Sequence, residues 1–196
     1  LLAFVALDAS AYVEHRIFHG VPWLWRVHRV HHADPDCDVT TGLRFHPLEA
    51  LAGLLTRAAV IVALGPPFAA VFAYELLATG VGLAAHCNVR VPATLERMLR
   101  PLVFTPSLHR IHHSADLPDT DRNFGIVSPV WDRLGGTFAG KASCADADFV
   151  VGLREFADPS ELRLDSVLTQ PFRSPGANVR LAPFPDSPRA QPRSTS

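Results

Sequence analysis

A short histidine-rich phrase occurs twice in this chain, as HRVHHAD at 28–34 and HRIHHSAD at 109–116. Each copy places histidines at i, i+3 and i+4, positions that share one face of a helix. A third stretch, HRIFH at 15–19, has the i, i+4 spacing. Neutral imidazole is the commonest metal ligand in proteins. The eight side chains are too many for one ion, so the pattern predicts a two-metal site made by His15, His19, His28, His31, His32, His109, His112 and His113.

Residues 48–85 are largely apolar and are interrupted by Gly-Pro-Pro at 65–67. Each half has about the 17–20 residues that a helix needs to cross the hydrocarbon core of a bilayer. The break between them suits a turn at the far side. A buried hairpin of a soluble protein is the alternative, favoured by Arg57 and Glu75. We expect the membrane hairpin, because the rest of the chain offers no partner of matching hydrophobicity.

Two crossings would return the chain to its starting side, so His46 and His86 would lie at the same membrane face with all the other histidines. Arginines cluster in the segments that flank this face, which by the positive-inside bias predicts the cytoplasmic side, in a bacterial inner membrane. They are Arg16, Arg26, Arg29, Arg44, Arg97, Arg100 and Arg110. The fold class predicted is therefore all-α: an integral membrane helical hairpin, or hairpins, with a cytosolic histidine-rich helical cap.

The chain divides into a catalytic domain at 1–148, a C-terminal extension at 149–172 and a disordered tail at 173–196. Helices are expected at 1–19 and about 22–33, an interfacial amphipathic helix at 91–104, a helix that starts after Thr105-Pro106, and a short helix or two in 149–172. Because the chain begins at Leu1 within an apolar stretch, we expect that preceding helices are missing. A net charge of −1 and the lack of a basic stripe argue against nucleic acid as a partner.

The motifs HRIFH, LWRVHRVHH, TTGLRFHPLE, HCNV, TPSLHRIHHS, NFG and WDRLGGTF occur in this order between residues 8 and 138. In this the chain resembles the fatty acid hydroxylase/sterol desaturase superfamily. The resemblance implies a membrane-embedded di-iron oxygenase that hydroxylates or desaturates unactivated C–H bonds of lipids, with four membrane helices and the eight histidines above as ligands. It adds His86, in the H-x-N position, as a ligand. For His46 a ligand role and a structural role stay open. One departure is Gly135, where family members often have an aromatic residue.

The residues themselves leave the metal open, because imidazole suits iron, copper, zinc and nickel. Oxidation of an alkyl chain explains a site beneath a bilayer better than hydrolysis does, so we expect two iron ions, O2 as co-substrate and a lipid that enters near 68–83. The chain has no haem, flavin or iron–sulfur motif, so electrons must come from a separate reductase or ferredoxin-like donor.

Two alternatives are a zinc-dependent membrane hydrolase or lyase and a non-enzymatic metal-binding membrane protein. The hairpin core at 50–84 contains no histidine, which counts against a metal transporter. Metal-bound histidines usually donate their second N–H to a neighbouring acceptor. The carboxylates expected in that role are Glu14, Asp34, Asp116, Asp119 and Asp132, and Asn88 is expected to hold a water near a metal.

Overall fold

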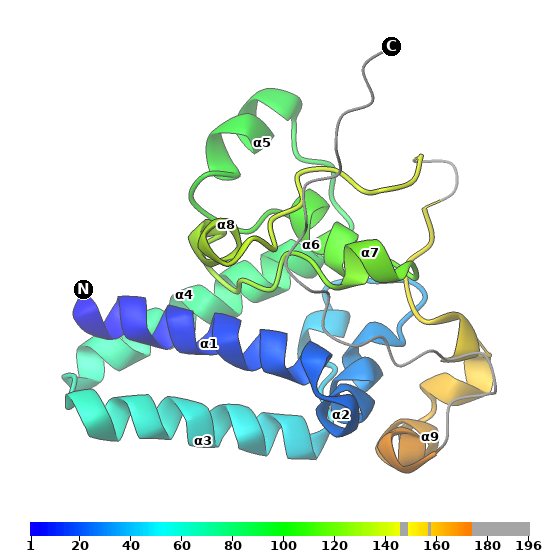
Figure 1. Cartoon of the computed structure of the whole chain (residues 1–196), viewed down its shortest axis with the longest axis horizontal. Coiled ribbons are helices and arrows are strands. Elements are labelled where there is room, and N and C mark those ends of the chain that lie inside the picture. Colours follow the sequence, from blue (N-terminus) through cyan, green and yellow to red (C-terminus); the bar gives the residue numbers. More distant parts are fainter. Residues whose placement is uncertain (146–148, 157, 174–196) are drawn as a thin grey trace.

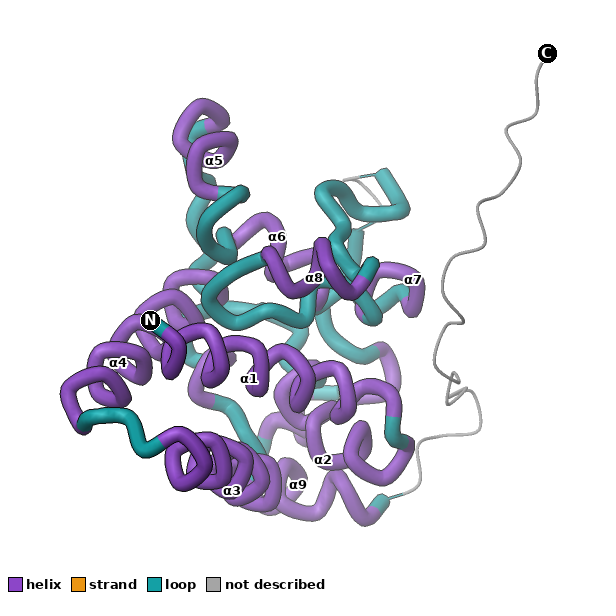
Figure 2. Tube along the Cα trace, turned by 60° about the vertical axis from the view of Figure 1, so that its left-hand side comes forward, coloured by secondary structure: helices purple, strands orange, loops and turns teal. Residues whose placement is uncertain are grey.

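The computed structural model describes residues 1–145, 149–156 and 158–173, and within these ranges the chain is built from helices and loops without a strand (Figure 2). Three long helices set the frame: α1 (Leu2–Gly20), α3 (Pro47–Leu64) and α4 (Phe68–His86). They lie lengthwise, with α1 packed against both α3 and α4 (Figure 1). The predicted all-α class is confirmed.

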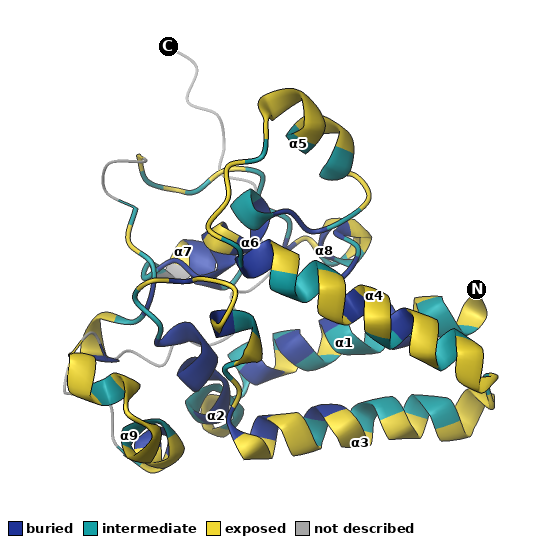
Figure 3. Cartoon of the chain, turned by 180° about the vertical axis from the view of Figure 1, so that it is seen from behind, coloured by how far each residue is buried: buried dark blue, intermediate teal, exposed yellow. Residues whose placement is uncertain are grey.

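The helices α3 and α4 form the predicted hairpin. Gly65 ends α3 with a φ of 57°, a left-handed conformation that glycine adopts without a steric cost. Both helices are long and apolar enough to cross a membrane, and only 11% of α3 and 17% of the apolar window of α4 are buried. The core helix of a soluble protein would be mostly buried. Exposed apolar side chains instead surround the hairpin, among them Val62, Phe68 and Leu76 (Figure 3). The hairpin therefore has the surface of a bilayer-spanning unit.

Shorter helices cover one side of this frame, from the end where α1 finishes and α3 begins to the region over the middle of α1 (Figure 1). The helix α2 (Pro22–His32) follows α1 directly and buries every residue from Val27 to His32. The others that belong to this cap are η1 (Thr41–Leu43), α5 (Ala93–Leu99), α6 (Pro106–His112), α7 (Leu117–Thr120) and α8 (Val130–Gly135). The expected helix at 91–104 is shorter in the structure, as α5, because residues 100–104 turn toward α6.

Two buried carboxylates, those of Asp8 and Asp132, hold residues 124–131 in place through hydrogen bonds. Asp8 of α1 accepts hydrogen bonds from the Trp131 indole at 2.8 Å and from the backbone N–H groups of Val127 and Ser128. Asp132 accepts from the N–H groups of Phe124 and Gly125, both at 2.8 Å. These contacts hold the NFG and WDRLGGTF motifs against α1.

Gly135 shows why an aromatic side chain is absent at that position. A Cβ built there would lie 2.0 Å from the Tyr12 hydroxyl oxygen, so Tyr12 already fills the space. The Tyr12 hydroxyl also hydrogen-bonds with Thr137. A larger side chain at Gly135 would therefore displace Tyr12.

The C-terminal extension carries the short helix expected there, α9 (Leu164–Thr169), together with the 3-10 turns η2 (Arg154–Phe156), η3 (Pro159–Leu162) and η4 (Gln170–Phe172). It packs on α2 through the fully buried Arg29, whose guanidinium donates to the carbonyls of Gln170 at 2.6 Å and Arg173 at 2.8 Å. Of the tail expected at 173–196, only Arg173 belongs to the described residues. The domain boundaries at 148 and 172 stay predictions.

Candidate metal centre

Nine of the ten histidines lie in the cap, where they form two groups. Within each group, the ligand atoms lie within 4.8 Å of one another. The five-histidine centre consists of His15, His19, His28, His32 and His112. The four-histidine centre consists of His31, His86, His109 and His113. The six histidines of the two HxxHH motifs and the two of HRIFH are all included, together with His86.

The two HxxHH motifs divide their side chains between the centres in a reciprocal way. In α2 the i and i+4 histidines, His28 and His32, belong to the five-histidine centre, whereas His31 points to the other. In the second motif His109 and His113 belong to the four-histidine centre, and His112 crosses to the first. The rings of His32 and His113 stack at 4.5 Å between centroids, so the two centres adjoin. The repeat therefore builds two interlocked sites.

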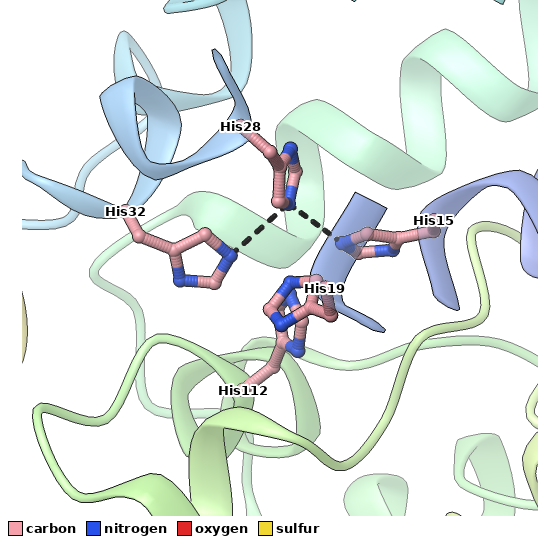
Figure 4. Close-up of side chains that lie close together, drawn as sticks. All are labelled: His15, His19, His28, His32 and His112. Carbon is pink, nitrogen blue, oxygen red and sulfur yellow. Dashed lines mark hydrogen bonds between the residues drawn. The ribbon is translucent and has the colours of Figure 1, made fainter. Parts of the chain in front are cut away.

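Figure 4 shows the rings of the five-histidine centre pointing inward from α1, α2 and the α6 helix. The Nε2 atoms of His15 and His28 are 3.0 Å apart, and those of His28 and His32 are 3.2 Å apart. In the four-histidine centre the corresponding Nε2 distances run from 2.9 to 3.2 Å, through His31, His86, His109 and His113. Each group thus aims its Nε2 atoms at a common point.

Hydrogen bonds on the outer side of the rings fix the tautomers. His15 Nδ1 donates to the Phe124 carbonyl at 2.7 Å, and His28 Nδ1 donates to Glu49 Oε1 at 2.5 Å. Because a neutral imidazole carries one proton, the Nε2 atoms of both rings then carry lone pairs. Two lone pairs that face each other at 3.0 Å repel, unless a cation lies between them. The residues present therefore fit a bound metal ion.

Three more rings are oriented in the same way. His112 Nδ1 donates to the Arg122 carbonyl at 2.7 Å and His86 Nδ1 to the Gly82 carbonyl at 2.6 Å. His19 Nδ1 donates to Asp121 at 3.2 Å. The Nε2 atoms of His19 and His112 are buried without a hydrogen-bond partner, as expected of free ligand atoms.

Burial keeps these ligands neutral. It lowers the pKa of His112 to about 3 and the pKa of His32 well below its ordinary value, with further lowering by neighbouring histidines. Burial also raises the pKa of Asp121 to about 6. Neutral imidazole is the form that binds a metal ion, so the cap stabilises the state that metal binding requires.

The five carboxylates predicted to accept the second N–H of a histidine do not do so. None of them hydrogen-bonds to a histidine, so this prediction was wrong. Asp34 accepts from Thr41, Asp119 accepts from Ser143, and Asp116 pairs with Arg154. Asp132 binds the backbone N–H of Phe124, one peptide away from the His15 contact. Glu14 lies in the cavity described below.

The partners that sequence reasoning missed are Glu49 and Asp121. Glu49 is the last residue of the RFHPLE motif, at the start of an apolar helix, which is a costly place for a lone carboxylate and a signal that it has a partner. Asp121 gives no comparable signal.

Two predicted site residues lie outside both centres. His46 caps α3: its Nδ1 accepts from the Leu48 N–H, and its Nε2 donates to the Leu168 carbonyl of the C-terminal extension at 3.2 Å. This is the structural role left open for it. Asn88 is exposed and lines a separate surface cavity with Cys37 and Arg110.

A cavity of about 390 Å³ opens beside the centres and continues between α1, α3 and α4. Histidines of both centres line it, namely His15, His28, His31, His86 and His109. The rest of the lining includes the apolar side chains Ala11, Ala50, Ala78 and Leu83. The cavity therefore connects the ligand cluster with the apolar hairpin of α3 and α4.

Comparison with known proteins agrees with this arrangement. The family profile described as Fatty acid hydroxylase matches residues 1–137. The chain belongs to this family. It is 32% identical over 139 residues to an ornithine lipid hydroxylase of Rhizobium tropici, which covers 70% of this chain and 41% of that protein.

The matched region covers a smaller share of two other relatives. An alkylglycerol monooxygenase of Homo sapiens is 30% identical over 138 residues, covering 69% of this chain and 29% of that protein. A very-long-chain aldehyde decarbonylase of Oryza sativa subsp. indica is 34% identical over 145 residues, covering 70% and 23%. The chain thus spans less than half the length of these relatives. No solved structure matches it.

Proposed function

We propose that this protein is the metal-binding part of a membrane-bound oxygenase that hydroxylates, or desaturates, an unactivated C–H bond of a lipid. The observation that carries the proposal is the pair of adjoining histidine centres with Nε2 lone pairs that converge beside an apolar cavity. Relatives named as a lipid hydroxylase and a monooxygenase support the same reaction class.

Two iron ions are the metals that we propose, held by the nine histidines of the two centres. Five histidines at one centre exceed the four ligands of a tetrahedral zinc site, so the ligand count suits iron better than zinc. It disfavours the zinc hydrolase or lyase.

Iron bound here would supply O2 reduction coupled to C–H oxidation, with the balance RH + O2 + 2 e⁻ + 2 H⁺ → ROH + H2O. The residues of the chain itself orient the imidazole rings and hold the substrate. The carbonyls of Phe124 and Arg122 and the carboxylate of Glu49 fix the imidazole rings from outside. The apolar cavity walls exclude water and align an alkyl chain beside the histidines.

The two electrons come from a separate reductase or ferredoxin-like donor, and the substrate comes from the bilayer. We place the centres on the cytoplasmic side of a bacterial inner membrane, supported by the arginines that flank the cap segments. A donor on that side could reach the cap without crossing the bilayer.

The test begins with metal analysis of protein purified without added metal. Two iron ions per chain are expected, and a Mössbauer or magnetic signature of paired iron. Lipid extracts of a host with and without the full-length gene are then compared by mass spectrometry under 18O2, where a product that carries 18O is expected for hydroxylation. Protein that contains only zinc and yet restores full activity would refute the oxygenase.

A further inference from the structure

Three charged side chains also line this cavity: Glu14 of α1, Arg57 of α3 and Glu75 of α4. Arg57 Nε is 3.3 Å from Glu75 Oε1. A Cβ built at Gly53 would lie 2.9 Å from Arg57 Nη1 and 3.3 Å from Glu14 Oε1, so both groups converge over this glycine. We call Glu14, Arg57 and Glu75 the polar trio.

The polar trio lies deep in the hairpin. Gly53, over which Arg57 and Glu14 converge, follows Pro47, the first residue of α3, by six positions, which corresponds to ~9 Å along the axis of an apolar helix. Charged side chains at that depth are rare. In membrane proteins they pair with one another and mark the paths and sites of polar ligands.

The cavity joins the polar trio to the metal centres. Glu49, which holds His28, and Arg57 are both in α3 and both line the cavity. The Arg57 guanidinium reaches back over Gly53, which is four residues from Glu49, or ~6 Å along the helix axis. Between the two ends the lining includes the small apolar side chains of Ala11, Ala50 and Ala78. A space that is polar at both ends and apolar between them fits an alkyl chain that carries a polar group.

The polar trio also keeps unused hydrogen-bonding capacity. Arg57 Nε is buried and has no hydrogen-bond partner, because its contact with Glu75 is an ion pair without hydrogen-bond geometry. Two carboxylates face one guanidinium, so acceptors remain as well as donors. A hydroxyl or an amide both donates and accepts. A plain hydrocarbon chain would leave these groups unpaired.

We propose that the cavity selects a lipid whose chain carries a hydroxyl or amide group held by the polar trio, while another part of the same chain lies beside the histidines. The polar trio is then a specificity determinant. This inference rests on the proposed function, because the histidine end of the cavity is taken as the reacting end.

The test measures lipid binding and turnover separately. The probes are stearate and a mid-chain hydroxystearate, with full-length protein in phosphatidylcholine nanodiscs. Affinity is measured on metal-free and on iron-loaded protein, and turnover on iron-loaded protein supplied with O2 and a chemical reductant as the two-electron donor. The hydroxylated probe is expected to bind about tenfold tighter or more, since a site built for a hydroxyl discriminates against the analogue that lacks it. Equal affinity for the two probes in the wild type overturns the inference, and this comparison needs no variant.

The variant is Arg57→Met combined with Glu75→Met, which removes the ion pair without leaving either partner alone. We expect the preference for the hydroxylated probe to disappear, with the metal content unchanged. The matched control is Arg90→Met, an exposed arginine outside the cavity, which should keep the preference. A preference that survives in the double variant overturns the inference.

The two proposals fail in different ways. Selective binding without oxidation of either probe would contradict the oxygenase and leave the polar trio supported. Oxidation of both probes with equal affinity and equal rate would contradict the polar trio and leave the oxygenase supported.

Discussion

Glu49 offers the sharpest test of the metal centre, because it touches a single ligand of a single centre. Its Oε1 accepts from His28 Nδ1 at 2.5 Å, and the side chain is buried. The carboxylate fixes the tautomer of His28 and raises the basicity of its Nε2. Removal of such an outer partner typically weakens metal binding 10- to 100-fold, equivalent to about 1.4–2.7 kcal/mol.

Two substitutions separate orientation from charge. Glu49→Gln keeps a carbonyl oxygen that can accept from Nδ1 and removes only the charge, so we expect the smaller loss of affinity, about 10-fold. Glu49→Leu removes the acceptor, leaves Nδ1–H unpaired and frees the ring to change tautomer, so we expect the larger loss, about 100-fold.

The assay is competition with a chelator, followed by metal analysis of the protein. Both variants should release one ion readily and retain the second, because the four-histidine centre has no contact with Glu49. The exposed Glu155 supplies the control, as Glu155→Gln. Unchanged metal affinity in Glu49→Leu, or equal loss of both ions, would refute the assignment of His28 to the five-histidine centre alone.

Further predictions follow from the same geometry. His31→Ala should weaken metal binding at the four-histidine centre and His32→Ala at the five-histidine centre, although the residues are adjacent. Both should abolish turnover, and magnetic spectra of the remaining ion should differ between the two; identical spectra would contradict reciprocal sharing. Arg29→Gln should lower the free energy of unfolding by about 2–3 kcal/mol, because charged hydrogen bonds to Gln170 and Arg173 are lost; denaturant titration in detergent measures this, and a change below 0.5 kcal/mol would contradict it. Metal-free protein should lose stability as pH falls from 7 to 5.5. Its unfolded histidines bind protons below about pH 6.5, whereas His112, with a pKa of about 3, does not; the loss is about 1 kcal/mol for each such histidine. Stability that is flat across this range would show that these side chains are not buried in neutral form.

Much of the fold was readable in the sequence because its signals are local. The Gly-Pro-Pro break between two apolar runs predicted the α3–α4 hairpin, and Gly65 adopts the left-handed conformation that this turn needs. Pro22 and Pro106 lie at the starts of α2 and α6, the helices that carry the HxxHH motifs. Helix periodicity and helix ends depend on neighbours within a few residues, so the linear pattern specifies them.

The sequence also determined the identity of the histidines, but only the tertiary structure decided how they are shared. Residues at i+3 and i+4 of a helix point about 100° apart, so His31 and His32 can serve different centres only where another helix brings the complementary pair. The same holds for the outer contacts. Glu49 is 21 residues from His28, and the carbonyl of Phe124 is 109 residues from His15. Such partners are chosen by packing between helices, and no spacing within one segment encodes them.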